Sequence, residues 1–248
     1  MTEYVIHADD FGHDDSVNDC IDKCFQYGWI GETSLMVNMP GCEKAICLAT
    51  QNGYLHRVGI HLNLTEGVPL TDQIRECRRI CDEDGKFNMV FHLSAKGRFV
   101  FSSSEKQAVS IEVEAQLKKF RDIQGAYLRL DSHHHVHTDW SVYQMVVPIA
   151  LRYGIREMRI SADLHKCGRA KSLYKILLNR NIRKRFLTTD HFDGITSAML
   201  SDPGGVTEVM VHPLLCNGQL CDTNKPFEDQ IKALKSAQNS FIRGWNHV

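Results

Sequence analysis

Short runs of β-branched and aliphatic residues alternate with longer segments of helical periodicity along most of the 248-residue chain. The short apolar runs predict strands at residues 4–8, 33–37, 58–62, 127–131, 157–160 and 208–211. The amphipathic segments predict helices at residues 15–27, 43–50, 106–123, 140–153, 173–185 and 227–242. Because strands and helices alternate, we expect an α/β fold in which helical crossovers join parallel strands.

Polar residues collect directly after several of the predicted strands. They are Asp9 and Asp10, His61 and Asn63, the histidines of residues 133–137, and His212. Active sites of parallel α/β folds lie at the carboxyl ends of the strands. This placement favours a (β/α) barrel-like arrangement, closed, irregular or seven-stranded, over an open doubly wound sheet.

The length of the chain fits one large domain, and we expect residues 1–248 to form a single (β/α) barrel-like unit. Residues 67–104 interrupt the alternation of strands and helices, with turn signals at Asp84-Gly85 and Lys96-Gly97. We therefore predict that this segment is an insertion after the third strand, which covers the site as a lid.

Composition excludes several classes of function. A formal net charge of −1 provides no electrostatic footprint for nucleic acid. The N-terminus reaches acidic residues almost at once, and no apolar run is long enough to span a membrane, so we expect a cytoplasmic protein. The cysteine pairs Cys20/Cys24 and Cys77/Cys81 have three residues between them rather than two, which disfavours zinc-finger and thioredoxin motifs.

The densest chemical signal is the sequence DSHHHVH at residues 131–137, which contains four of the thirteen histidines. Imidazole is a common ligand of transition metals and a proton carrier near neutral pH. A solvated histidine-rich turn, or ring stacking at the surface, is the alternative. In an extended segment His133, His135 and His137 would share one side and His134 would point to the other. One ion then cannot take all four, and further ligands must come from elsewhere.

The paired carboxylates Asp9 and Asp10 follow the first predicted strand. Such a pair can divide its roles, one carboxylate binding a cation while the other takes a proton from water. Helix capping is the alternative, but Asp14 and Asp15 lie closer to the predicted start of the helix and explain the capping better. We therefore assign Asp9 and Asp10 to the functional site.

Three further strand ends carry candidate residues. His61 and Asn63 stand two positions apart at the end of the third strand, where a lone histidine would more often be a packed core residue. His212 precedes Pro213 at the end of another strand and suits a general acid. Arg159 lies in a predicted strand and could orient a carboxylate through paired hydrogen bonds, with an ordinary surface arginine as the alternative.

Taken in order, six motifs resemble those of the YdjC-like carbohydrate deacetylases. They are HADDFG at 7–12, SLMVN at 34–38, GIHLNLTEGVPL at 59–70, DSHHHVH at 131–137, YGIREMR at 153–159 and MVHP at 210–213. The resemblance implies a (β/α) barrel-like fold and a hydrolase that removes acetyl groups from N-acetylated sugars, such as chito-oligosaccharides, with a divalent cation. The chain departs from the family pattern at His7 and Leu214, which surround the implied site rather than supply its ligands.

The resemblance also implies roles for individual residues. Asp10, His61 and His133 would hold the metal, and Asp9 would accept a proton from water as it attacks the amide carbonyl. His212 would donate a proton to the leaving amine. The remaining candidates, Asn63, His135, His137 and Arg159, would contact the substrate or support the ligands from behind.

One divalent metal ion is the expected cofactor. An Asp/His/His donor set suits zinc, manganese, cobalt or nickel better than magnesium, whereas the family is commonly described with magnesium, so Mg²⁺ and Zn²⁺ both stay open. The expected partner is a small N-acetylated saccharide, and a homodimer is a candidate assembly. Two alternatives are a metal-dependent phosphoesterase or sugar isomerase on a similar barrel, and a non-catalytic sugar- or metal-binding protein, which would not need Asp9.

Overall fold

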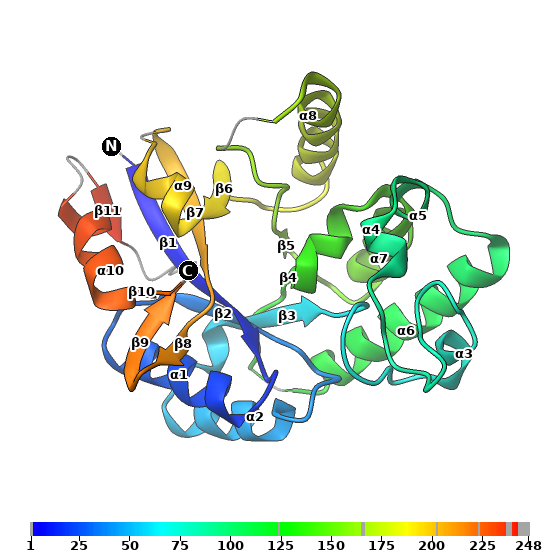
Figure 1. Ribbon diagram of the computed structural model, residues 1–248, viewed down its shortest axis with the longest axis horizontal. Coiled ribbons are helices and arrows are strands. Elements are labelled where there is room, and N and C mark those ends of the chain that lie inside the picture. Colours follow the sequence, from blue (N-terminus) through cyan, green and yellow to red (C-terminus); the bar gives the residue numbers. More distant parts are fainter. Residues whose placement is uncertain are drawn as a thin grey trace.

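A curled parallel sheet surrounded by helices forms the body of the protein (Figure 1). The computed structural model describes residues 2–123, 125–164, 167–201, 203–222, 224–236 and 240–242. Seven strands run parallel in the order β5-β4-β3-β2-β1-β7-β6. They are β1 (Thr2–Phe11), β2 (Glu32–Leu35), β3 (Val58–Leu62), β4 (Arg129–Ser132), β5 (Glu157–Met158), β6 (His191–Gly194) and β7 (Gly205–Val211).

The two edges of this sheet approach each other. Glu157 of β5 forms a parallel bridge with Leu187, just before β6, and the Met158 amide donates to the Leu187 carbonyl at 3.1 Å. The Asp163 amide donates to the carbonyl of Phe192 in β6 at 3.1 Å. Strand twist accumulates around a sheet and lets it curl in this way. The predicted barrel-like arrangement is therefore confirmed in a seven-stranded, incompletely closed form.

Helices follow most strands and cover the outside of the sheet. The longer ones are α1 (Asp15–Gln26), α2 (Cys42–Gln51), α6 (Ser103–Arg121), α7 (Trp140–Arg152), α8 (Arg169–Arg183) and α10 (Phe227–Ser236). Asp14 caps α1 by accepting hydrogen bonds from the amides of Ser16 and Val17. Ser102 and Glu105 form a capping box at the start of α6, which explains why that helix begins three residues before the predicted position 106. Among the described residues, no helix is both long and apolar enough to cross a bilayer.

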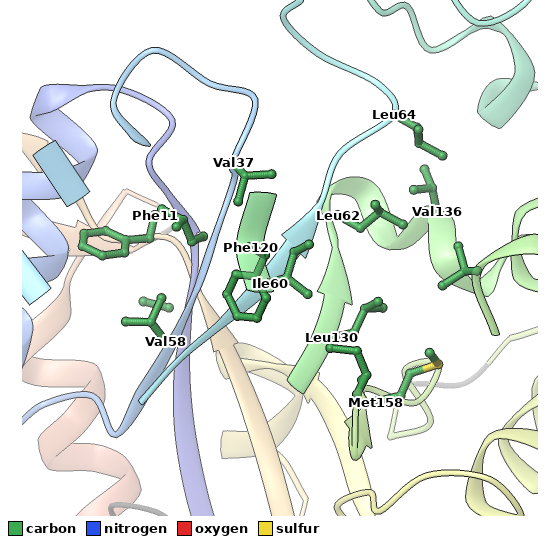
Figure 2. Packing of buried hydrophobic residues seen from close by; sticks show 14 of the residues in the cluster. Phe11, Val37, Val58, Ile60, Leu62, Leu64, Phe120, Leu130, Val136 and Met158 are labelled. Carbon is green, nitrogen blue, oxygen red and sulfur yellow. The ribbon is translucent and has the colours of Figure 1, made fainter. Parts of the chain in front are cut away.

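Strand alternation separates an apolar outer face of the sheet from a charged inner face. Val58, Ile60 and Leu62 of β3 face the helices, and Figure 2 shows Phe120 of α6 beside Ile60. His61, between them, faces inward and is paired in register with Asp131 of β4. The hydrophobic core therefore lies between the sheet and the surrounding helices, and polar side chains fill the interior of the barrel.

Several elements of the C-terminal half differ from the prediction. Strand β6 and the short helix α9 (Ile195–Met199) were not expected, because the four residues HFDG carry too little apolar pattern. The chain also forms β8 (Leu214–Cys216), β9 (Gln219–Asp222) and β10 (Lys225–Pro226). An Asn217-Gly218 turn with positive φ at both residues, a typical hairpin signal, joins the first two of these strands.

The helix predicted over residues 227–242 is wrong at its C-terminal end. Helix α10 ends at Ser236, and β11 (Ser240–Ile242) pairs in parallel with the start of β1. In addition, α8 begins at Arg169 rather than at residue 173.

The segment 67–104 contains three short helices, α3 (Asp72–Arg75), α4 (Val90–Leu93) and α5 (Ala95–Phe99). Buried Glu112 of α6 anchors its start by accepting hydrogen bonds from the amides of Leu70 and Thr71. His92 of α4 binds Asp139, at the start of α7, at 2.6 Å. The role of this segment as a lid, and the single-domain organisation of the chain, stay predictions.

Candidate functional site

Three side chains from three different strand ends meet at the mouth of the barrel. Asp10 lies near the end of β1, His61 lies in β3, and His133 follows β4 directly. The Asp10 Oδ1 atom is 3.2 Å from His61 Nε2 and 2.8 Å from His133 Nδ1. Potential ligand atoms of all three residues lie within 4.8 Å of one another, as binding of a single ion requires.

The backbone around Asp10 aims its carboxylate at this point. Pairing between β1 and β2 shifts register between Ala8 and Phe11, and Asp10 adopts a left-handed φ of 69°. A bulge of this kind redirects a side chain at the rim of a barrel, and aspartate tolerates the left-handed region better than most residues. Gly12 follows at φ 89°, where an added Cβ would lie 2.8 Å from Leu35 Cδ1.

The hydrogen bonds of His61 leave one ring nitrogen free for a cation. Its Nδ1 atom is 2.7 Å from Asp131 Oδ1, and since a carboxylate only accepts, Nδ1 carries the proton. Its Nε2 atom is buried without a hydrogen-bond partner and faces Asp10. Burial acts to lower the pKa of His61, yet the charge of Asp131, the hydrogen bond to it and the adjacent Asp10 carboxylate raise the pKa to about 10. The position therefore favours a positive charge, which a bound metal ion would supply.

His133 has a carboxylate on each side of its ring. Besides the contact with Asp10, its Nε2 atom lies 3.0 Å from Oε2 of Glu66. Glu66 belongs to the GIHLNLTEGVPL motif, but the sequence pattern alone does not indicate a role for it. Its position in the loop that follows β3, close to the candidate residues at the strand end, is the feature of the sequence that could have indicated a role in the site.

Asp9, next to Asp10 in β1, is held by Arg159 in the interior of the barrel. The guanidinium donates two hydrogen bonds to the carboxylate, at 2.8 and 2.7 Å, and both side chains are buried. Burial acts to raise the pKa of Asp9, but the Arg159 charge lowers it to about 2. Asp9 is therefore ionised at neutral pH.

The interior below these residues contains further carboxylates balanced by arginine. Glu208 Oε1 lies 2.6 Å from both Arg159 Nε and Arg129 Nη2, and Asp131 Oδ2 lies 2.9 Å from Arg159 Nη2. Two deeper groups could also hold a cation by geometry, namely His7/Asp131/Glu208 and Asp9/His61/Asp131. Both are already compensated by these guanidinium groups, so the Asp10/His61/His133 group is the better metal site.

The expectation that residues 133–137 are extended is wrong. The chain turns into the 3-10 segment η2 (His133–Thr138), with left-handed φ values of 52° at His134 and 56° at His135. The predicted alternation of faces therefore does not apply. Of this run, only His133 joins a potential metal-binding group among the described residues.

The other three histidines of the run point to separate surroundings. His134 is exposed and bonds Thr65 Oγ1 through Nδ1 at 3.0 Å. His135 packs edge-on against Phe192, and its Nδ1 atom is buried without a partner. His137 is fully buried, between the Ser132 hydroxyl and the Arg159 carbonyl.

His212 and Asn63 occupy different places relative to this group. His212 Nε2 lies 3.9 Å from Asp10 Oδ2, and its side chain is 42% exposed, so it borders the site and is open to solvent. The Asn63 amide is engaged within its own loop. Its Oδ1 accepts from the amides of Thr65 and Glu66, and its Nδ2 donates to the Glu66 carbonyl.

Comparison with known proteins adds an independent line of evidence. The model of the YdjC-like protein family matches residues 3–240. A curated carbohydrate deacetylase of Vibrio cholerae (strain ATCC 39541) is 32% identical, covering 94% of this chain and 88% of its own length. The carbohydrate deacetylase of Geobacillus stearothermophilus is 30% identical over 93% and 86%, and that of Clostridium beijerinckii is 28% identical over 96% and 92%.

A solved structure supports the fold. It is that of a "putative cellobiose-phosphate cleavage protein" from Enterococcus faecalis V583, with a TM-score of 0.67 and 20% sequence identity, and the match covers 87% of this chain and 82% of that one. The family match extends over nearly the whole chain, and the relatives align over most of their own length. The chain therefore belongs to the YdjC-like protein family.

Proposed function

We propose that this protein is a metal-dependent hydrolase that removes acetyl groups from N-acetylated sugars or small oligosaccharides. The observation that carries the proposal is the meeting of Asp10, His61 and His133 beside the buried carboxylate of Asp9. Curated relatives named carbohydrate deacetylases, aligned over most of the chain, support the same reaction and a sugar substrate.

Asp10, His61 and His133 would hold one divalent cation. The unpartnered Nε2 atom of His61, facing the Asp10 carboxylate, fits such an ion. When bound, the cation lowers the pKa of water toward neutrality and polarises the carbonyl of the amide. Two imidazoles and one carboxylate favour Zn²⁺, Co²⁺, Mn²⁺ or Ni²⁺ over Mg²⁺ by ligand softness.

Asp9 would act as the general base. It is adjacent in sequence to the proposed ligand Asp10, and it is ionised at neutral pH, so it can accept a proton from the attacking water. Arg159 holds both oxygens of its carboxylate and restricts its rotation.

His212 would donate the proton that the leaving amine needs. Its imidazole borders Asp10 from the side of β7, so it reaches the site from a different strand than Asp9. Its exposure also allows it to exchange protons with solvent between turnovers. Asp9 and His212 together would provide the base and the acid of amide hydrolysis, with one proton accepted and one donated in each cycle.

The proposal is tested by acetate release from N-acetylglucosamine and its oligomers, using metal-reconstituted protein. We expect release by the wild type, a loss of at least about 10²-fold in Asp9→Asn, and no release in His133→Ala. Asp72→Asn, a change at a 92%-exposed aspartate, is the matched control and should keep full activity. No acetate from a varied panel of N-acetyl sugars, or undiminished release in both site variants, would refute the proposal. Turnover of an aryl phosphate at a comparable rate would instead indicate a phosphoesterase.

A further inference from the structure

Glu66 contacts the metal-facing histidine from the side away from Asp10. It lies in the loop that follows β3, and its two carboxylate oxygens contact different histidines. Oε2 is 3.0 Å from His133 Nε2, and Oε1 is 3.1 Å from Nε2 of His13. We propose that Glu66 is a positioning residue, which fixes the ring and the tautomer of His133 so that its Nδ1 lone pair faces the cation. This inference rests on the metal site of the proposed function but not on the identity of the sugar.

Both ring nitrogens of His133 face carboxylates. A carboxylate only accepts, so the bond to Glu66 requires a proton on Nε2. The other ring nitrogen, Nδ1, lies 2.8 Å from Asp10 Oδ1, within the group of potential ligand atoms. A cation bound at Asp10 would take the place of a proton on Nδ1, and the ring would keep its Nε2 proton in the hydrogen bond to Glu66. Metal-binding histidines commonly donate their second N–H to a carboxylate in this way, which increases their basicity as ligands.

Glu66 is itself held from two directions. Its backbone amide donates to Asn63 Oδ1 at 3.1 Å, and its carbonyl accepts from Asn63 Nδ2 at 2.7 Å. Its side chain is bonded to His13, whose Nδ1 atom lies 2.9 Å from the carboxylate of Asp14, the N-cap of α1. This chain of contacts links the start of α1 to the metal-facing ring. The order of the Glu66 carboxylate therefore comes from the fold and does not require bound metal.

Two other roles for Glu66 predict different effects of its substitution. If Glu66 only makes surface ion pairs, its loss should hardly matter, because its side chain is 43% exposed and exposed pairs contribute little to stability. If Glu66 is a direct ligand, its loss should change the number of ligands on the metal. The contact to Nε2 argues against this second reading, since the atom of His133 that faces Asp10 is Nδ1.

The test is the affinity of the metal-free protein for Zn²⁺ and Co²⁺, measured by calorimetry and by competition with a chelator. We expect Glu66→Ala to weaken binding by about 10–100-fold. We expect Glu66→Gln to retain part of the affinity, because its amide oxygen can still accept from Nε2. His13→Gln should give a smaller loss than Glu66→Ala. Glu83→Ala, at an exposed glutamate of the 67–104 segment, is the matched control and should bind as the wild type does.

The proposal is overturned if Glu66→Ala binds both ions within about twofold of the wild type. It is also overturned if the Co²⁺ absorption spectrum of that variant reports one ligand fewer, which would make Glu66 a ligand. The melting temperature of the metal-free variants should stay near that of the wild type, and a large fall would indicate a structural role instead. Because affinity is measured without substrate, failure to release acetate would count against the proposed function and leave this inference standing.

Discussion

Arg159 binds Asp9 through two parallel hydrogen bonds, Nη1 to Oδ2 at 2.8 Å and Nη2 to Oδ1 at 2.7 Å. Both side chains are buried, and the third guanidinium nitrogen, Nε, is bonded to Glu208 at 2.6 Å. A planar guanidinium satisfies both oxygens of a carboxylate at once, which no other side chain can do. The pair joins the end of β1 to the segment that follows β5, across the mouth of the barrel.

Arg159→Lys should keep a positive charge but lose the paired geometry. A lysine ammonium is a point charge and cannot reproduce the fork, so Asp9 gains rotational freedom. We expect kcat for acetate release to fall by about 10²-fold, with KM changed much less, because a misplaced base affects the chemical step. Arg180→Lys on the exposed face of α8 is the matched control. An unchanged kcat would show that the pairing does not position the base.

Glu208→Gln should lower the free energy of unfolding of the protein. Glu208 Oε1 accepts from Arg129 and Arg159 at 2.6 Å each, in the interior of the barrel. Neutralising it removes the charge from the 2.6 Å contact with each buried guanidinium group, and breaking a buried ion pair typically costs about 3–5 kcal/mol. We expect a loss of stability of this size in urea unfolding at pH 7.5. A loss below about 1 kcal/mol would mean that the other buried carboxylates balance the charges of Arg129 and Arg159 without Glu208.

The positions of the three proposed ligands were predictable from the sequence. Asp10, His61 and His133 each stand at the end of an apolar run, and parallel strands bring their carboxyl ends to one edge of the sheet. The pairing of Ile60 with Leu130, and of His61 with Asp131, fixes how β3 and β4 bring these ends together. The sequence could therefore predict that these three distant residues lie close together, because their proximity follows from the order of parallel strands.

The local geometry of the site was not predictable. Left-handed φ values at His134 and His135 are uncommon outside glycine, and hydrogen bonds to Thr65 and Thr138 accompany them. The partners of Arg159 and Glu66 come from residues 150 and 67 positions away, so no spacing rule identifies them. Strand β6 was missed because pairing with β7 on one side, rather than its own apolar pattern, holds it in the sheet.

Removing the metal should lower the stability of the protein. An ion that binds only the folded chain stabilises it by about 2.7 kcal/mol at a concentration one hundred times its Kd. We expect the melting temperature to fall on treatment with a chelator and to return on addition of Zn²⁺. Asp10→Asn should abolish this response, because it replaces the carboxylate that contacts both histidines with a neutral amide. A response of equal size in that variant would place the stabilising ion elsewhere.

His137 is the buried histidine whose hydrogen bonds fix its protonation most clearly. The Arg159 carbonyl accepts from Nε2 at 3.1 Å, so the neutral ring carries its proton there, and the Ser132 hydroxyl donates to Nδ1 at 2.5 Å. A second proton would have to displace this hydroxyl bond. Burial accordingly lowers the pKa of His137 to about 4, although the charge of Asp131 opposes the shift.

His137→Gln should therefore cost less stability at low pH than at high pH. Between pH 6.5 and 4 the unfolded wild type binds a proton at this histidine and the folded protein does not, so its contribution is complete above pH 6.5 and is lost as the pH falls. Glutamine can keep both hydrogen bonds but does not titrate. In urea unfolding of chelator-treated protein, we expect the stability gap between wild type and variant to shrink by about 2 kcal/mol from pH 8 to pH 5. A gap that stays constant or widens would show that folded His137 takes up the proton as readily as the unfolded chain does, and that the Ser132 hydroxyl turns to accommodate it.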